Sequence, residues 1–278
     1  MQLFGFEFYL SILVGCIYLA GGYLLATGPA RRRYGWSDHP PTTRQTTSFM
    51  LAVALIFFSL NGPLHRLSDD YLFSAHMVQH MLVMLLMPPL LIAGLPDWLI
   101  RAGLRVRPVR VMARFLTHPV TAFVAYNLVF IGWHFPQMYN WALINHDVHI
   151  LQHITFMTVS VMMWWPVVNP VKELEIIPTG PLLILYVFVF GIPATALSAM
   201  LTLSDSVFYP WYAMAPRVSA LSALDDQRLG GLIMWVPGML IFWTAMTVVF
   251  FRWTRDEYRD WGKEGGTEPP LPSVKLSS

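Results

Sequence analysis

Long runs of apolar residues, separated by short polar stretches, dominate this chain. Seven runs reach or approach the ~20 residues that an α-helix needs to cross a bilayer. Apart from Glu7 and Asp147 near predicted helix ends, these runs contain no Asp, Glu, Lys or Arg. Because only helices and closed barrels satisfy their backbone hydrogen bonds in lipid, the pattern predicts an all-α, polytopic protein with seven transmembrane helices. The predicted spans are residues 6–28, 48–64, 71–95, 117–135, 147–168, 181–203 and 229–251.

The distribution of charged residues predicts how the helical bundle is oriented in the membrane. Only 12% of the 278 residues are charged, against about 25% in soluble domains. Fifteen of the 18 Lys and Arg residues fall on one side of the predicted spans, and Arg66, Arg217 and Arg228 on the other. The positive-inside rule therefore predicts an N-terminus outside and a C-terminus in the cytoplasm. Arginine loops are commonly solvated at anionic lipid headgroups, so the charge requires no nucleic-acid partner.

The pattern divides the chain into a seven-helix membrane domain, residues 1–255, and a cytoplasmic tail, residues 256–278. The tail is rich in Gly, Pro and Ser and is predicted to be disordered. Within the domain, the hairpins 48–95 and 117–168 carry histidines at matching places. They are therefore interpreted as a possible parallel repeat of one helical hairpin.

Two connectors mix apolar and polar side chains. Residues 97–114 combine arginines with Leu, Val and Trp, and are predicted to lie flat on the membrane surface. Residues 204–227 form the longest outer loop and hold Tyr209 and Tyr212 among several aromatics. A position at the membrane interface is the simplest explanation, because Trp and Tyr favour that depth.

Two runs with the same spacing open the third and fifth predicted helices: His76-Met-Val-Gln-His80 and His149-Ile-Leu-Gln-His153. Residues four apart share one face of a helix, so each run places two imidazoles side by side. Under the predicted orientation both pairs lie at the outer ends of their helices. Titratable groups at membrane depth are costly, and imidazole is the commonest metal ligand. The repeated pairs therefore favour a metal or haem site over simple helix capping.

Four further residues are predicted to support the pairs. His65 and His134 end the helices that precede the two runs, and are candidate accessory ligands. Gln79 and Gln152 occupy the same place within each run, where a side-chain amide can hold an imidazole in its ligating tautomer.

The start of the last helix holds another candidate group. Asp226 and Arg228 are predicted to form a paired outer cluster beside the histidines. The alternative is that Asp225 or Asp226 only caps the helix on which it lies. Gly230 and Gly231 follow, and small residues allow close contact between helices.

The type of metal follows from what accompanies the imidazoles. The runs lack the glutamate of His-Glu-x-x-His zinc proteases and no intramembrane carboxylate replaces it, so hydrolysis is disfavoured. Magnesium and calcium need oxygen ligands. Imidazole with abundant methionine suits copper, particularly Cu(I). A b-type haem held by one histidine of each pair is the alternative cofactor, and a scaffold subunit without metal is the other alternative.

Three segments then carry a family resemblance. They are His76-Met-Val-Gln-His80-Met with Pro88-Pro89, the His149–His153 run leading into Trp164-Trp165-Pro166, and Asp226-Gln-Arg-Leu-Gly-Gly-Leu-Ile-Met-Trp-Val-Pro-Gly238. Together they resemble the CtaG-type cytochrome c oxidase assembly factors, a seven-helix membrane family. The resemblance implies a non-enzymatic factor in a bacterial plasma membrane that supplies copper to a haem-copper oxidase. It also implies cytochrome c oxidase subunits, extracytoplasmic copper chaperones and membrane lipids as partners.

Overall fold

The structure, a computed structural model, describes residues 8–263, and every regular element in this range is helical. Six helical stretches are long and apolar enough to cross a membrane. Two further helices, α8 and α9, are bent by 64° at their junction and make a seventh span if taken together. The predicted all-α, multi-pass bundle is therefore confirmed, while its orientation stays a prediction.

The four spanning stretches between residues 71 and 203 begin and end within two residues of the predicted spans, whereas the first two are displaced by four or five residues and the last is longer. The spanning stretches comprise α1 (Leu10–Leu25), η1 (Ala26–Ala30) and α2 (Arg31–Arg33); α3 (Thr43–Leu60); α5 (Phe73–His80), η2 (Met81–Leu86) and α6 (Met87–Ala93); α9 (Pro119–His134); α11 (His146–Val168); α12 (Pro181–Thr202); and α14 (Ala223–Lys263). The short helices are α4 (Pro63–Asp70), α7 (Asp97–Leu104), α8 (Arg107–Leu116), α10 (Pro136–Ile144), η3 (Lys172–Leu174) and α13 (Pro210–Met214).

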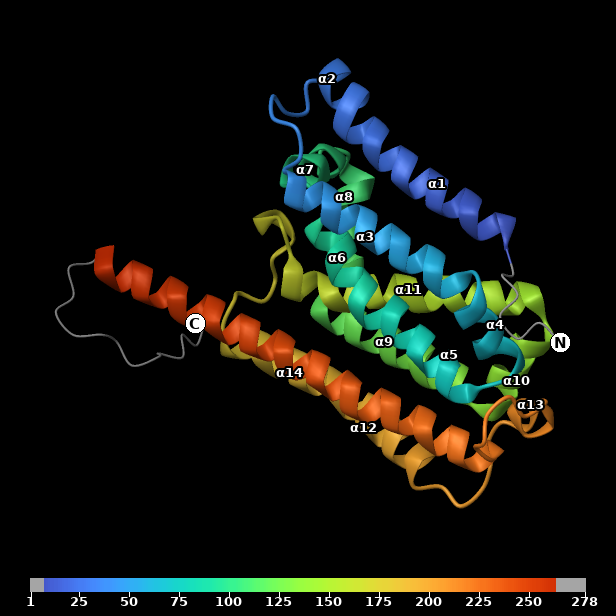
Figure 1. Cartoon of the computed structure of the whole chain (residues 1–278). Coiled ribbons are helices and arrows are strands. Elements are labelled where there is room, and N and C mark those ends of the chain that lie inside the picture. Colours follow the sequence, from blue (N-terminus) through green and yellow to red (C-terminus); the bar gives the residue numbers. More distant parts are fainter. Residues whose placement is uncertain (1–7, 264–278) are drawn as a thin grey trace.

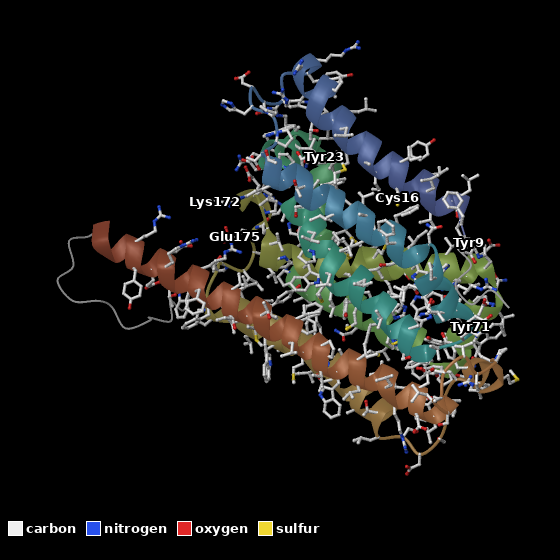
Figure 2. All side chains as sticks on the ribbon, viewed as in Figure 1. Tyr9, Cys16, Tyr23, Tyr71, Lys172 and Glu175 are labelled. Carbon is white, nitrogen blue, oxygen red and sulfur yellow. The ribbon has the colours of Figure 1, made fainter. Side chains whose placement is uncertain are left out.

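The bundle has two chemically different ends. Helices α4, α10 and α13 gather at one end, and α2, α7 and α8 lie at the other (Figure 1). Tyr9 and Tyr71 mark the first end, whereas Lys172 and Glu175 lie toward the second (Figure 2). The histidine runs open α5 and α11 at the first end, next to α4 and α10. Histidine-rich and arginine-rich segments thus lie at opposite ends of the bundle.

The last helix is much longer than its predicted span of 229–251. Helix α14 has 41 residues and extends past both ends of the apolar run. Hydropathy detects only the apolar middle of such a helix. The charged residues at either end are unfavourable within lipid, but they do not prevent the helix from continuing outside it. Residues 256–263 of the predicted disordered tail are therefore helical, and residues 264–278 lie outside the described part of the chain.

A π-helical turn follows the first histidine pair. Pro88 lacks an N–H group and cannot donate to the carbonyl of Met84, four residues earlier. The helix adopts the wider π form over Met81–Leu86, on the N-terminal side of this proline, and the indole N–H of Trp164 donates to the Met84 carbonyl at 3.2 Å. Such bulges arise where a proline disturbs the helical ladder and recur near functional sites. The proline thereby links the third spanning stretch to α11.

The two hairpins interpreted as a repeat share one layout. Each has a long helix, a short helix that begins at a proline, and a second long helix that carries a histidine pair. The prolines, Pro63 and Pro136, lie 73 positions apart, as do the corresponding histidines of the pairs. The common layout is compatible with duplication, which stays a prediction.

The arginine-rich connector, 97–114, folds into α7 and the first part of α8. On α8, Val111, Met112 and Phe115 are all well exposed beside arginines of the same helix. Exposed apolar and basic side chains on one short helix suit the surface of a membrane. The location of α8 on that surface stays a prediction.

Gly231 sets the distance between α14 and α12. A Cβ atom there would lie 2.6 Å from Oγ1 and 2.8 Å from the backbone nitrogen of Thr202. Because backbone cannot move aside cheaply, we expect Gly231→Ala to lower the free energy of unfolding by about 1–3 kcal/mol. Gly238→Ala is the matched control, since its nearest neighbour is the flexible end of Met81 at 3.6 Å. Thermal unfolding in detergent compares the two; equal midpoints would contradict the close contact.

Candidate functional site

In each histidine pair the two Nε2 atoms lie within hydrogen-bond distance of each other. Nε2 of His76 lies 2.8 Å from Nε2 of His80, and Nε2 of His153 lies 2.9 Å from Nε2 of His149. Two nitrogens that bind one ion at about 2.0 Å lie about 2.8 Å apart at a right angle and about 3.3 Å apart at a tetrahedral angle. Each pair therefore has a spacing that one metal ion can bridge. All four side chains are buried.

The pairs also come together, although they lie on different helices. The ring centroids of His76 are 6.1 Å from His149 and 6.3 Å from His153, and His80 lies 6.1 Å from His153. In the part of the chain that the structure describes, no three His, Cys, Asp or Glu side chains form a metal-binding group as they stand. The four imidazoles thus form one cluster of two pairs, and bringing three side chains around one ion would require a side-chain rotation.

The accessory histidines join the same cluster but differ in what their nitrogens bind. His65, on α4, stacks on His149 at 5.6 Å. Its Nδ1 is 2.9 Å from the amide nitrogen of Gln79, and its Nε2 is 3.4 Å from Asp69. Since the Gln79 amide can only donate, the Nε2 of His65 carries the proton and donates to Asp69. Both ring nitrogens of His65 are therefore occupied.

His134, at the end of α9, presents a free nitrogen instead. Its Nδ1 donates to the carbonyl of Phe130 at 2.6 Å, which leaves Nε2 as an unprotonated lone pair. That Nε2 is buried and has no hydrogen-bond partner. The ring lies 6.0 Å from that of His80. His134 is thus better placed than His65 to act as a third ligand.

In each pair, the Nδ1 atom of the first histidine contacts one oxygen atom. Nδ1 of His149 lies 3.2 Å from Oδ2 of Asp69, and Nδ1 of His76 lies 3.2 Å from the hydroxyl of Tyr212. The Tyr212 hydroxyl donates its own proton to the carbonyl of Ser68, so it accepts from His76. In both rings Nδ1 carries the proton and Nε2 is the lone pair. This orientation is typical of metal-binding histidines.

The second histidine of each pair lacks such support. Nδ1 of His80 and Nδ1 of His153 are buried without a hydrogen-bond partner, as is the amide oxygen of Gln152. Buried polar atoms without partners cost about 1–3 kcal/mol each and usually indicate an interaction that the protein alone does not complete. Together with Nε2 of His134, these atoms give the cluster an unusually high number of unsatisfied groups.

Gln79 contacts an imidazole, as the sequence predicts, whereas Asp226 and Arg228 have partners that the sequence does not indicate. Gln79 bonds to His65 rather than to a paired histidine. Asp226 and Arg228 do not form the expected pair: Asp226 binds the first residues of α5, and Arg228 bonds to Ser204 and Asp205. The pairing fails because Asp226 points into the bundle, where it is fully buried, while Arg228 points toward the outer loop.

Asp69 is the residue that sequence reasoning missed. It touches both His65 and His149, and so joins the two hairpins through one carboxylate. Its place four residues after His65 on a helix was a usable signal, because such residues share a face. The contact with His149, 80 positions away, had no signal in the sequence.

The aromatic loop of residues 204–227 packs against the cluster, and its position relative to the membrane interface stays a prediction. Tyr209 and Tyr212 are each only 1% exposed, and Tyr209 donates to the carbonyl of His134 at 3.0 Å. Trp211 donates through its indole to the carbonyl of Asp69 at 2.7 Å. Burial raises the pKa of Tyr209 and of Tyr212, so both phenols stay protonated and able to donate.

The charge state of the cluster follows from burial. Desolvation by burial, together with the nearby His146, lowers the pKa of His65 to about 4. At neutral pH the ring is therefore uncharged, and its contact with Asp69 is a hydrogen bond rather than an ion pair. A neutral imidazole is also the form that binds metals.

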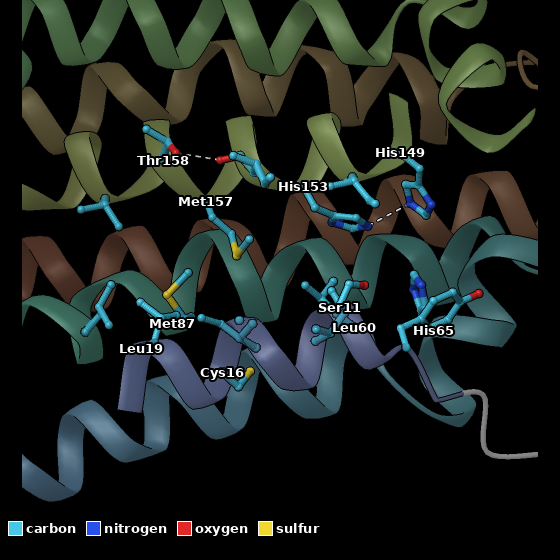
Figure 3. A pocket seen from close by; sticks show the side chains of 18 of the residues that line it. Ser11, Cys16, Leu19, Leu60, His65, Met87, His149, His153, Met157 and Thr158 are labelled. Carbon is cyan, nitrogen blue, oxygen red and sulfur yellow. Dashed lines mark hydrogen bonds between the residues drawn. The ribbon is translucent and has the colours of Figure 1, made fainter. Parts of the chain in front are cut away.

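A groove of about 390 Å³ reaches one side of the cluster, between α1, α3 and α11 (Figure 3). His65, His149 and His153 line one end of it. Farther along, the groove is apolar and includes the sulfur atoms of Cys16, Met87 and Met157. These are soft ligands of the kind that bind Cu(I).

Comparison with known proteins identifies the family. The sequence profile of the cytochrome c oxidase caa3 assembly factors (Caa3_CtaG) matches residues 21–256. The chain belongs to this family. The match covers six of the seven predicted helices in full and the end of the first, and it contains every histidine of the cluster, so the resemblance inferred from the three segments is confirmed.

The caa3 assembly-factor chain also has curated relatives in mycobacteria. Uncharacterised proteins of Mycobacterium bovis and Mycobacterium tuberculosis are each 26% identical to it over 261 residues, and one of Mycobacterium leprae is 25% identical over 286 residues. These alignments cover 87–90% of this chain but only 38% of each relative, so the chain spans well under half of their length. No solved structure matches the chain significantly.

Proposed function

We propose that this caa3 assembly factor binds copper at the histidine cluster and aids its delivery to a cytochrome c oxidase in the bacterial plasma membrane. The observation that carries the proposal is the two buried histidine pairs, whose Nε2 atoms lie 2.8 and 2.9 Å apart on α5 and α11. The oxidase subunits would be its partners, and extracytoplasmic copper chaperones its suppliers.

The ligand set favours copper over the other common metals. Imidazole nitrogens dominate the cluster, and Asp69 is the one carboxylate that the described contacts bring to it. Magnesium and calcium prefer several oxygen ligands. The thioethers of Met87 and Met157 in the adjoining groove add the soft donors that Cu(I) prefers.

A non-catalytic role agrees with the same chemistry. A hydrolytic metal site needs an open coordination position and a base, usually a glutamate, to activate water. Asp69 is hydrogen-bonded to His65 and His149, so it orients ligands rather than serving as a free base. The cluster is therefore suited to holding an ion as cargo.

The cluster is less suited to a b-type haem. A haem between α5 and α11 would be held axially by one histidine from each helix. The second imidazole of each pair lies within 2.9 Å of the first, where the haem ring would have to be. Binding a haem would require both extra imidazoles to move away.

Metal analysis tests the proposal. We expect the full-length protein, purified in detergent without chelator, to contain stoichiometric copper and little iron, and to show no haem absorption band. The variant with alanine at all four paired histidines should contain less than about a tenth of that copper. Losing a residue that only supports a ligand already lowers metal affinity by about 10–100-fold, and losing the ligands themselves should lower it more.

His39→Ala is the matched control, because His39 is exposed and bonded only to Ser37. It should leave the copper content unchanged. Stoichiometric iron with a haem band would instead indicate an electron-transferring cytochrome. A folded protein that takes up neither metal would contradict the proposal and favour a scaffold.

A further inference from the structure

The two histidine pairs correspond in sequence but differ in their surroundings. His76 and His149 open the two runs, and each uses Nδ1 to donate to an oxygen about 3.2 Å away. For His149 that oxygen belongs to the carboxylate of Asp69, whereas for His76 it belongs to the phenol of Tyr212. A carboxylate raises the basicity of an imidazole more than a neutral phenol does.

Access to the pairs differs too. His149 and His153, here called the groove pair, line the 390 Å³ groove between α1 and α11. His76 and His80, the buried pair, do not line that groove, and His76 is 0% exposed. His80 borders a separate cavity of about 30 Å³. An ion can therefore approach the groove pair directly, while the buried pair lies behind it.

The nitrogens converge within each pair and not across the pairs. Contacts of 2.8 and 2.9 Å join the Nε2 atoms inside the pairs. Between residues 8 and 263, no hydrogen-bond contact links a nitrogen of the groove pair to one of the buried pair. In a single site with four histidine ligands, the four ligating nitrogen atoms would lie within about 3.3 Å of one another.

Each pair also has its own additional histidine. His134 has a buried Nε2 lone pair without a partner, and its ring lies 6.0 Å from that of His80. His65 lies 5.6 Å from His149 and 6.1 Å from His153. His134 and His65 thus lie beside different pairs, while the rings of the two pairs are 6.1–6.3 Å apart.

From these observations we infer that the cluster holds two copper ions at unequal sites, one on the groove pair supported by Asp69 and one on the buried pair beside His134. The inference rests on the proposed copper function and adds its stoichiometry and the different environments of the two sites. Two ions with different surroundings suit a carrier that loads from the groove and holds a second ion deeper in the bundle.

Copper titration of the full-length protein in detergent tests this inference. Cu(I) is added under anaerobic, reducing conditions in competition with a colorimetric Cu(I) chelator. We expect two ions per chain for the unmodified protein and for His39→Ala. We expect one ion per chain for His76→Ala/His80→Ala and one for His149→Ala/His153→Ala. Size-exclusion profiles and helix content by circular dichroism show whether each variant is folded, and the single variants His80→Gln and His153→Gln replace any pair variant that is not.

Asp69→Asn separates unequal sites from equal ones. Losing the carboxylate behind a ligating histidine costs about 10–100-fold in metal affinity. We expect this variant to bind two ions, one of them about 10–100-fold more weakly, and the weak site to disappear when His149→Ala/His153→Ala is added. A uniform loss at both sites, or none at either, would overturn the assignment of Asp69 to the groove pair.

The outcomes distinguish this inference from the proposed function. One ion per chain in the unmodified protein, and none in either pair variant, means that the four histidines form a single site, and the two-ion inference fails while copper binding stands. If the folded, unmodified protein binds no Cu(I), the proposed function itself is wrong.

Discussion

Cells whose only copy of this protein carries His76→Ala and His149→Ala are expected to retain at most about a tenth of normal cytochrome c oxidase activity. The reason lies in the geometry of the proposed copper site. His76 and His149 are the members of each pair whose Nδ1 is held by an oxygen, so their Nε2 lone pairs are the best oriented. The double variant leaves one ligand in each pair, and neither pair can then chelate an ion.

Oxygen uptake by isolated membranes measures the effect, and the copper content of the purified oxidase shows whether the defect lies in metal delivery. His39→Ala, an exposed histidine outside the cluster, is the control. Immunoblots establish that each variant reaches the membrane in normal amounts. Normal oxidase activity in the double variant would contradict a metal role and indicate that the histidines only pack.

The fold was predictable because lipid imposes a simple demand on the sequence. Spans such as 147–168 and 181–203 differ from the observed helices by one residue at an end. Several short helices escaped prediction. Helices α4, α10 and α13 have no long apolar run, and their positions depend on contacts with other segments rather than on their own composition.

The sequence predicted which histidines form the candidate site. It did not predict which residues orient their rings. The spacing of His76 with His80, and of His149 with His153, follows from helical geometry, and the observed nitrogen contacts agree with it. The oxygens that orient those rings come from distant segments. The hydroxyl of Tyr212 reaches His76 across 136 positions, so no local pattern could have indicated it.

The role of Asp226 was also impossible to predict from the local sequence, because its partners lie far away in the chain. The sequence places it at the start of α14, where capping of its own helix or a pair with Arg228 was expected. Instead Ser222 and Asp225 bond to each other at the start of that helix, and Asp226 accepts from Phe73 N at 2.7 Å, Ser74 N at 3.3 Å and the Ser74 hydroxyl. It therefore caps α5, 153 positions earlier in the chain.

This cap matters because α5 carries the buried pair and has no cap of its own. Leu72, at the N-cap position, has no side-chain oxygen to accept from the first turn. A fully buried carboxylate that accepts several hydrogen bonds at a helix N-terminus is favoured by those bonds and by the helix dipole. Asp226 thus fixes the start of the helix three residues before His76.

We expect Asp226→Ala to lower the free energy of unfolding by about 2–4 kcal/mol, since it leaves buried N–H groups of α5 without an acceptor. Asp225→Ala is the matched control. It removes an exposed carboxylate whose partner is Ser222, and should cost no more than about 1 kcal/mol. Thermal unfolding of both variants in the same detergent compares them. Because the cap positions His76, the copper capacity of folded Asp226→Ala should fall at the buried pair before the groove pair. Midpoints for Asp226→Ala and Asp225→Ala that coincide would show that α5 does not depend on this carboxylate.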